Sequence, residues 1–155
     1  MYKKLLIAAA VLCTLAAHAT AETVTIGNLK IDSPTLRATA PGANVGAGYL
    51  SITNMGTATE RLTGGDASFA GKVEIHEMKM ENQVMRMKHL ADGLEIPAGK
   101  TAILAPGGNH VMFMQLKEPL MEGENQPVSL IFENAGKIDL NFEVKSIAAT
   151  MKMKN

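Results

Sequence analysis

The sequence predicts a single all-β domain, and three observations lead to this conclusion. Short runs of alternating apolar and polar residues recur along the chain, as strands with one buried face require. Glycine, proline, asparagine and aspartate separate these runs at regular intervals. No stretch carries the apolar stripe that marks a long amphipathic helix. An antiparallel sandwich or Greek-key barrel of eight or nine strands is therefore expected.

The N-terminal segment has the organisation of a secretory signal peptide. Lys3 and Lys4 provide its positive region, an apolar run follows, and Ala19-Thr20-Ala21 is an A-x-A cleavage site. We therefore expect residues 1–21 to be removed and the mature, periplasmic chain to begin at Glu22. The apolar run is too short for a comfortable membrane span, so no stable membrane insertion is expected.

Removal of the signal peptide changes the chemistry that is available. Cys13 is the only cysteine, so the mature chain has no disulfide and no thiolate ligand. Lipidation of Cys13 is disfavoured because Leu12, not a small residue, precedes it. Without the two lysines of the signal, 13 Lys and Arg face 15 Asp and Glu, which gives no indication of a nucleic-acid partner. We place one domain at residues 22–150 and a flexible Met/Lys tail at 151–155.

The alternating runs and the turn signals give the following order of elements. The expected strands are residues 23–26, 36–39, 48–54, 72–76, 83–87, 101–104, 110–116, 127–133 and 138–144. The expected turns centre on residues 41–42, 54–56, 64–66, 81–82, 97–99, 106–108 and 134–136, which are rich in Gly, Pro, Asn and Asp.

The run after the turn at 106–108 carries histidine and methionine on one face. Strand alternation directs His110, Met112 and Met114 to one side, and the apolar Val111 and Phe113 to the other, where a core is expected. Imidazole and thioether groups are borderline and soft metal ligands. Neighbours on the same face lie about 6.6 Å apart at Cα, so His110 and Met112 can converge on one ion.

A second such set lies upstream, where His76 is followed by Met78 and Met80 at the same period, and then by Met85 and Met87. Of the ten methionines of the mature chain, six lie between positions 78 and 114, beside all three of its histidines. By the same alternation we interpret His76 as a ligand. Met78 and Met80 fit an apolar lip over the site better than direct ligation.

The remaining candidates have simpler interpretations. Met114 fits a ligand less well than a core residue or a neighbour of the ligands. His89 precedes a turn and is interpreted as an exposed loop histidine. Met55 and Met121 are isolated in the sequence and are interpreted as core residues.

The donor types select the metal. Thioethers bind Cu(I) well and contribute little to zinc, calcium or magnesium sites. A blue-copper electron-transfer site requires a cysteine thiolate, which the mature chain lacks. No G-x-S-x-G is present, and the H-E-x-x-H pattern that His76-Glu77 begins fails at Met80. We therefore expect a binding protein that hands over its metal, and not an enzyme.

The chain resembles the periplasmic copper(I) chaperones of the PCuAC family, which serve the CuA centre of cytochrome oxidase. Their signature is a histidine, ten residues, a methionine, twenty-one residues and H-x-M. His76 followed by ten residues reaches Met87, and His110-Val111-Met112 supplies the H-x-M. Segments 47–54, 73–76, 96–99 and 106–110 also resemble the family across nearly the whole mature chain. Two features depart from it: twenty-two residues separate Met87 from His110, and a tryptophan common among relatives is absent.

This resemblance implies a cupredoxin-like Greek-key β-barrel that binds one Cu(I) per chain through His76, Met87, His110 and Met112. It also implies a monomer that delivers copper to an oxidase subunit, in cytochrome oxidase assembly, or to an upstream copper carrier. Met87 is preferred to Met85 because a longer loop between residues 88 and 93 can absorb the extra residue without shifting the strand register.

Two other functions remain open at this stage. A periplasmic copper buffering or resistance protein would bind the ion without delivering it to an oxidase. An interaction module of sandwich fold would use the His/Met face only as an adhesive patch.

Overall fold

The computed structural model describes residues 22–153, so the predicted signal peptide lies outside the described residues. The strands are β1 (Thr23–Ile26), β2 (Leu29–Arg37), β3 (Val45–Asn54), β4 (Glu60–Asp66), β5 (Ala70–Glu81), β6 (Val84–His89), β7 (Leu94–Ile96), β8 (Thr101–Leu104), β9 (Asn109–Leu116), β10 (Asn125–Phe132) and β11 (Gly136–Lys145). One short helix, α1 (Ile147–Thr150), follows them. No helix in this part of the chain is long and apolar enough to cross a membrane.

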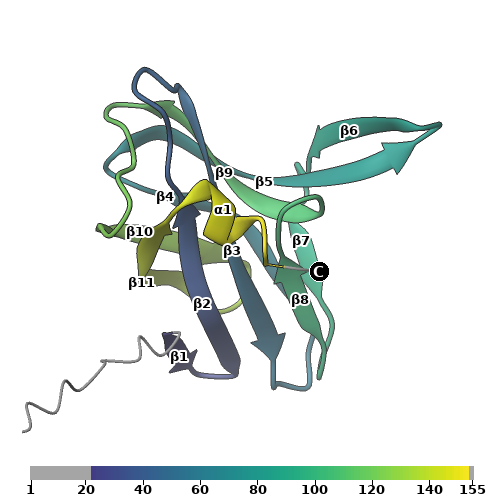
Figure 1. Ribbon diagram of the computed structural model, residues 1–155. Helices are drawn as coiled ribbons and strands as arrows, with labels where there is room; N and C mark the ends of the chain where they lie inside the picture. Colours follow the sequence, from purple (N-terminus) through teal and green to yellow (C-terminus); the bar gives the residue numbers. More distant parts are fainter. Residues whose placement is uncertain (1–21, 154–155) are drawn as a thin grey trace, which may run out of the picture.

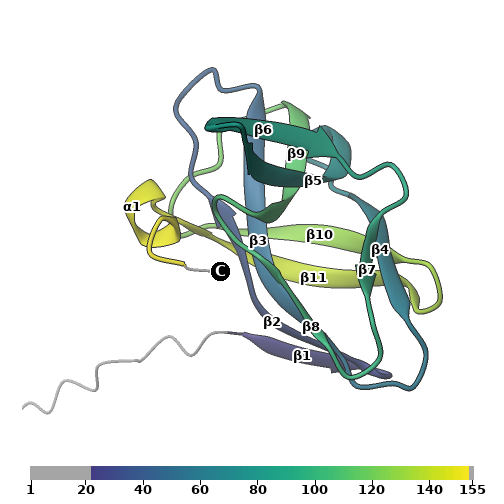
Figure 2. The same ribbon diagram turned by 90° about the vertical axis from the view of Figure 1, so that its right-hand side faces the viewer.

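The strands form one sheet that closes on itself (Figures 1 and 2). Ten of them follow the order β6-β5-β9-β8-β3-β2-β11-β10-β4-β7, and β1 pairs with β2 beside this path. An additional β4–β5 pairing joins the sheet into a barrel. The predicted all-β fold is confirmed. Most pairings are antiparallel, but β2 pairs with β11 and β8 with β9 in parallel, which the sequence did not indicate.

Two strands were missed by the sequence analysis, β4 and β7. The predicted turn at residues 64–66 is wrong, because Gly64 and Gly65 continue β4 and pair with β10. A Cβ on Gly65 would lie 2.7 Å from the carbonyl oxygen of Ser129, so the glycine permits close approach of two strands here and does not reverse the chain.

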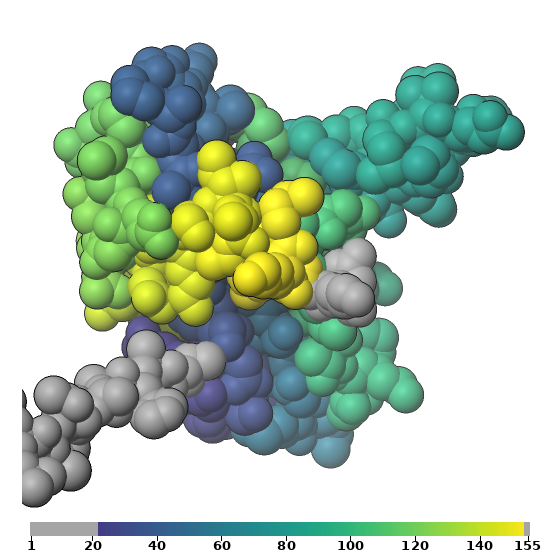
Figure 3. Space-filling model, in the orientation of Figure 1, coloured from purple at the N-terminus to yellow at the C-terminus, as the bar shows by residue number. Residues whose placement is uncertain are grey.

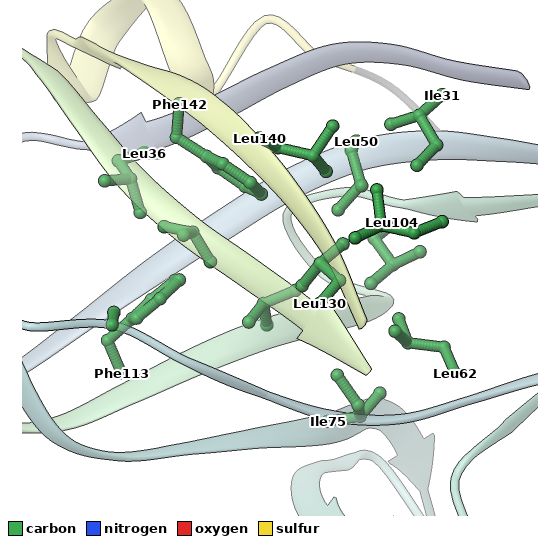
Figure 4. Packing of buried hydrophobic residues seen from close by; sticks show 14 of the residues in the cluster. Ile31, Leu36, Leu50, Leu62, Ile75, Leu104, Phe113, Leu130, Leu140 and Phe142 are labelled. Atoms are coloured by element: carbon green, nitrogen blue, oxygen red, sulfur yellow. The ribbon is translucent and has the colours of Figure 1, made fainter. Parts of the chain in front are cut away.

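Apolar side chains from most of the strands fill the barrel (Figure 4). Val111 and Phe113 of β9 are fully buried, as strand alternation predicted. The ring of Phe113 lies 5.3 Å from that of Phe69 and 6.4 Å from that of Phe142, measured between centroids. This packing fixes the inner face of β9, and therefore also sets the direction of the histidine and methionines on its outer face.

Strands β5 and β6 form a hairpin whose outer part projects from the barrel (Figures 1 and 3). Its two-residue turn has positive φ at both Asn82 (50°) and Gln83 (64°), as in the type I′ turn whose twist suits paired strands. The register places Met78 opposite Met87 and Met80 opposite Met85.

Candidate metal centre

His110 enters the site directly after a tight turn. Pro106 and Gly107 occupy its centre, and Gly107 has a φ of 86°, which a side chain would disfavour. The amide of Gly108 donates to the carbonyl oxygen of Ala105 at 3.1 Å. The His110 side chain folds back so that Nδ1 donates to the carbonyl oxygen of Gly108 at 3.0 Å. This bond fixes the tautomer and leaves the lone pair of Nε2 available to a metal.

His76 lies opposite His110 in the β5–β9 pairing, and the two ring centroids are 5.9 Å apart. The Nε2–H of His76 donates to Oε2 of Glu74 at 2.8 Å. Nδ1 of His76 is buried and has no hydrogen-bond partner among the described residues. A buried nitrogen with a free lone pair is what a metal ligand requires, and the carboxylate orients the ring as metal-binding histidines are commonly oriented.

Glu74 was not identified as a site residue from the sequence. Its side chain is buried, and it contacts Nζ of Lys72 as well as His76. The hydrogen bonds from Lys72 and from His76 lower the pKa of Glu74 to about 2, so it is a carboxylate at neutral pH. Its place two residues before His76, on the same strand face, was the available signal.

Burial favours the neutral form of the His110 ring, whereas a salt bridge would favour the protonated form. Desolvation lowers the pKa of His110, and the positive potential of His76 and Arg37 adds to this, while the Gly108 carbonyl opposes it. The neutral ring, which is the form that binds metal, is therefore favoured to a lower pH than in a free histidine.

A cavity of about 480 Å³ opens beside these histidines. Three of the four predicted ligands line it: Met87, His110 and Met112. His76 lies next to the cavity, as its contact with His110 shows, but does not line it. Met85 does not line the cavity. A turn follows β6 in the segment where the extra residue was expected, and there the amide of Gly93 donates to the carbonyl oxygen of Leu90 at 2.8 Å.

Other residues at this cavity were not predicted as ligands. Met78 lines it, in keeping with the expected apolar lip, whereas Met80 lies further out on the hairpin. Arg37 of β2 and Met151, just after α1, also line it. Met151 belongs to the segment predicted as a tail; its amide donates to the carbonyl oxygen of Ile147 at 3.0 Å and continues the helical turn.

His89 is exposed, as expected, but it lies at the end of β6 and not in a loop, which corrects that part of the sequence-based interpretation. It pairs with His76 in the ladder, the two ring centroids are 5.5 Å apart, and its Nδ1 lies 4.0 Å from Oε1 of Glu74. The assignment of Met55 and Met121 to the core is also wrong, because both are exposed. Isolation in the sequence does not show which way a side chain of a loop points.

The donors that converge here are neutral: two imidazoles with oriented nitrogens and several thioethers. Among the residues that the structure describes, no three His, Cys, Asp or Glu side chains come together as a metal-binding group. Met78, Met87 and Met112 bring thioethers to the cavity wall, and sulfur donors of this kind suit a soft, singly charged ion and suit zinc poorly.

The sequence and the fold were compared with those of known proteins. Residues 29–144 match the family described as "Putative lipoprotein LpqE-like". A curated relative, the putative lipoprotein Lxx21020 of Leifsonia xyli subsp. xyli, is 34% identical over 109 residues, which span 70% of this chain and 66% of the relative. The chain thus matches slightly less than two thirds of the length of that protein.

Several solved structures have the same fold. The apo PCuAC domain of PmoF1 is 26% identical, with a TM-score of 0.68 over 81% of this chain and 99% of that one. The copper-bound PCuAC domain of PmoF2 is 24% identical, with a TM-score of 0.69 over 81% and 98%. The solution structure of CuI-DR1885 from Deinococcus radiodurans is 29% identical, with a TM-score of 0.57 over 83% of each chain. The predicted resemblance is confirmed, and the chain belongs to the LpqE-like family and has the cupredoxin-like fold of the PCuAC domains.

Proposed function

We propose that this protein is an exported copper(I) metallochaperone that binds one Cu(I) through His76, Met87, His110 and Met112. One observation carries the proposal: two histidines face each other with one ring nitrogen oriented and the other available, beside a cavity with methionine in its wall. The titles of two similar structures, which name a copper-bound PCuAC domain and CuI-DR1885, support copper as the cargo.

The proposed mechanism is ligand exchange. Neutral imidazole and thioether donors hold Cu(I) without the strong retention that thiolates give. An acceptor rich in cysteine or histidine can then replace the donors one at a time. The exposed position of Met87, whose side chain is 48% accessible, supports a ligand that an acceptor can displace first.

The binding part of the proposal is tested by anaerobic titration of residues 22–155 with Cu(I) against a Cu(I) chelator, followed by X-ray absorption at the copper edge. We expect one tightly bound ion with nitrogen and sulfur neighbours, and much weaker binding of Zn(II). Equal preference for zinc would contradict the thioether site.

Delivery to the copper centre of a haem–copper oxidase, or to an upstream carrier, is the second part of the proposal. Deletion of the gene is expected to lower oxidase activity at limiting copper, with rescue by wild-type protein but not by His110→Ala. Normal oxidase activity combined with copper sensitivity would instead favour the buffering function.

Export is proposed from the signal peptide, with cleavage before Glu22. The word lipoprotein in the names of the family and of the relative makes Cys13 the alternative processing site. Intact mass of the exported protein separates the two, because only a lipid-modified chain would retain Cys13.

A further inference from the structure

The β5–β6 hairpin carries more imidazole and thioether groups than the proposed four-ligand site requires. Three facing pairs follow one another toward its tip: His76 with His89, Met78 with Met87, and Met80 with Met85. Residues that face each other in an antiparallel pair project to the same side, and alternation keeps every second residue on that side. One face of the hairpin is therefore composed of imidazole and thioether groups.

The other face of the same hairpin is charged. Lys79 pairs there with Arg86 and Glu77 with Lys88, and Nε of Arg86 lies 3.6 Å from Oε2 of Glu81. Segregation of charge to one face and methionine to the other is the pattern of a strand that buries one side. No other element of the described residues covers the methionine face of the outer hairpin, because the hairpin projects away from the barrel (Figure 3).

The outermost pair is well exposed. Met80 is 59% and Met85 46% accessible, so core packing does not account for these two side chains. Facing residues have Cβ atoms about 4.5–5.5 Å apart, and methionine has three rotatable bonds, so the two sulfurs can meet on one soft ion. The next pair inward, Met78 with Met87, is two residues away, or about 6.6 Å along the strands.

We propose that Met80 and Met85 form an outer, two-thioether Cu(I) position on the hairpin, from which the ion passes by way of Met78 and Met87 to the inner site. The inference rests on the proposed function. Two neutral donors hold the ion more weakly than four, so the outer position loads and unloads the inner one. Each transfer exchanges one thioether for another, and the copper remains Cu(I) throughout.

The test is an anaerobic Cu(I) titration of the mature chain labelled with 13C at the methionine methyl groups, followed by NMR together with chelator competition. The first equivalent is expected to shift the methyl signals of Met87 and Met112. A second equivalent, bound at least tenfold more weakly, is expected to shift those of Met80 and Met85. The double variant Met80→Leu/Met85→Leu keeps the side-chain bulk and removes both sulfurs, and Met121→Leu is the matched exposed control.

The double variant is expected to bind the first equivalent with unchanged affinity, to lose the second, and to exchange Cu(I) with the chelator at least threefold more slowly. Met121→Leu is expected to match the wild type in all three measurements. If the wild type binds the first equivalent of Cu(I) but the methyl signals of Met80 and Met85 do not shift with the second, the outer position alone is overturned. If the wild type fails to bind the first equivalent of Cu(I), the proposed function itself is overturned.

Discussion

The two sides of the candidate metal centre differ in how firmly the barrel holds them. His110 and Met112 lie on β9, whose inner face is packed in the core, and only 5% of His110 is accessible. Met87 lies on β6, where every residue is exposed and which, among the described strands, pairs only with β5. One side of the centre is therefore preorganised by the core, and the other depends on the hairpin.

In the proposed metallochaperone, which holds an ion and then releases it, this difference would divide the two tasks between the two sides. Donors fixed by core packing bind without further loss of conformational entropy, and so contribute most to affinity. Donors on an exposed hairpin are accessible to an acceptor and contribute less to affinity. The predictions below probe that contrast, from the largest expected effect to the smallest.

Removing the support beneath β9 should have the largest effect. Phe113→Ala creates a cavity between the rings of Phe69 and Phe142, and it should lower the free energy of unfolding by about 3–5 kcal/mol. Val84→Ala at the exposed start of β6 should change it by less than about 0.5 kcal/mol. Urea denaturation of both apoproteins provides the measurement, and equal losses would show that the two sides are held alike.

Removing the preorganised ligand should have the next largest effect. His110→Ala should weaken Cu(I) binding by about a hundredfold, or about 2.7 kcal/mol, in chelator competition. Binding to the wild type should also weaken as the pH falls, because protons compete for the imidazoles.

The lowered pKa of His110 sets the direction of its share in this pH dependence. The folded state favours the neutral ring of His110, so the stability that this ring contributes to the apoprotein is present above the ordinary histidine pKa and is lost as the pH falls through the lowered pKa of His110. Cu(I) binding through His110 is lost over the same range of pH. In His110→Ala the slope of affinity against pH should shrink. An unchanged slope would mean that His110 is not a ligand.

On the hairpin, Met87 and Met85 are two residues apart on one strand face, but only Met87 lines the cavity. Met87→Leu keeps the bulk and removes the sulfur, so Cu(I) affinity should fall at least about tenfold, or 1.4 kcal/mol. Met85→Leu should cost much less in the first equivalent. The reverse order in matched titrations would show that the extra residue before His110 had shifted the register.

The smallest expected effect concerns the orientation of His76. Glu74→Gln removes the charge that holds Nε2–H and should weaken Cu(I) binding by about tenfold. Because the pKa of Glu74 is about 2, this loss should be constant from pH 5 to 8. Glu77→Gln, on the opposite face of β5, is the control. Identical affinities for the two variants would show that the Glu74 carboxylate does not position the ring.

Local pattern was sufficient for much of this protein. Alternation in β9 was enough to place Val111 and Phe113 on one face and His110 and Met112 on the other. A strand directs successive side chains to opposite faces wherever it lies in the fold. The hairpin turn was located to within one residue, because it was expected at Glu81-Asn82 and is centred on Asn82 and Gln83, and asparagine tolerates the positive φ that such a turn requires. The donor types could be read in the same way and indicated a soft metal.

Only the tertiary structure decided which of these residues meet. The pairing of His89 with His76 and the place of Met151 at the cavity depend on register and packing between segments that carry no mark of one another in the sequence. Strand β4 was missed for a related reason, because Gly65 serves a close approach to β10 that local turn preference cannot reveal. Pairing between strands is a long-range choice, made by the whole barrel as it buries its apolar faces.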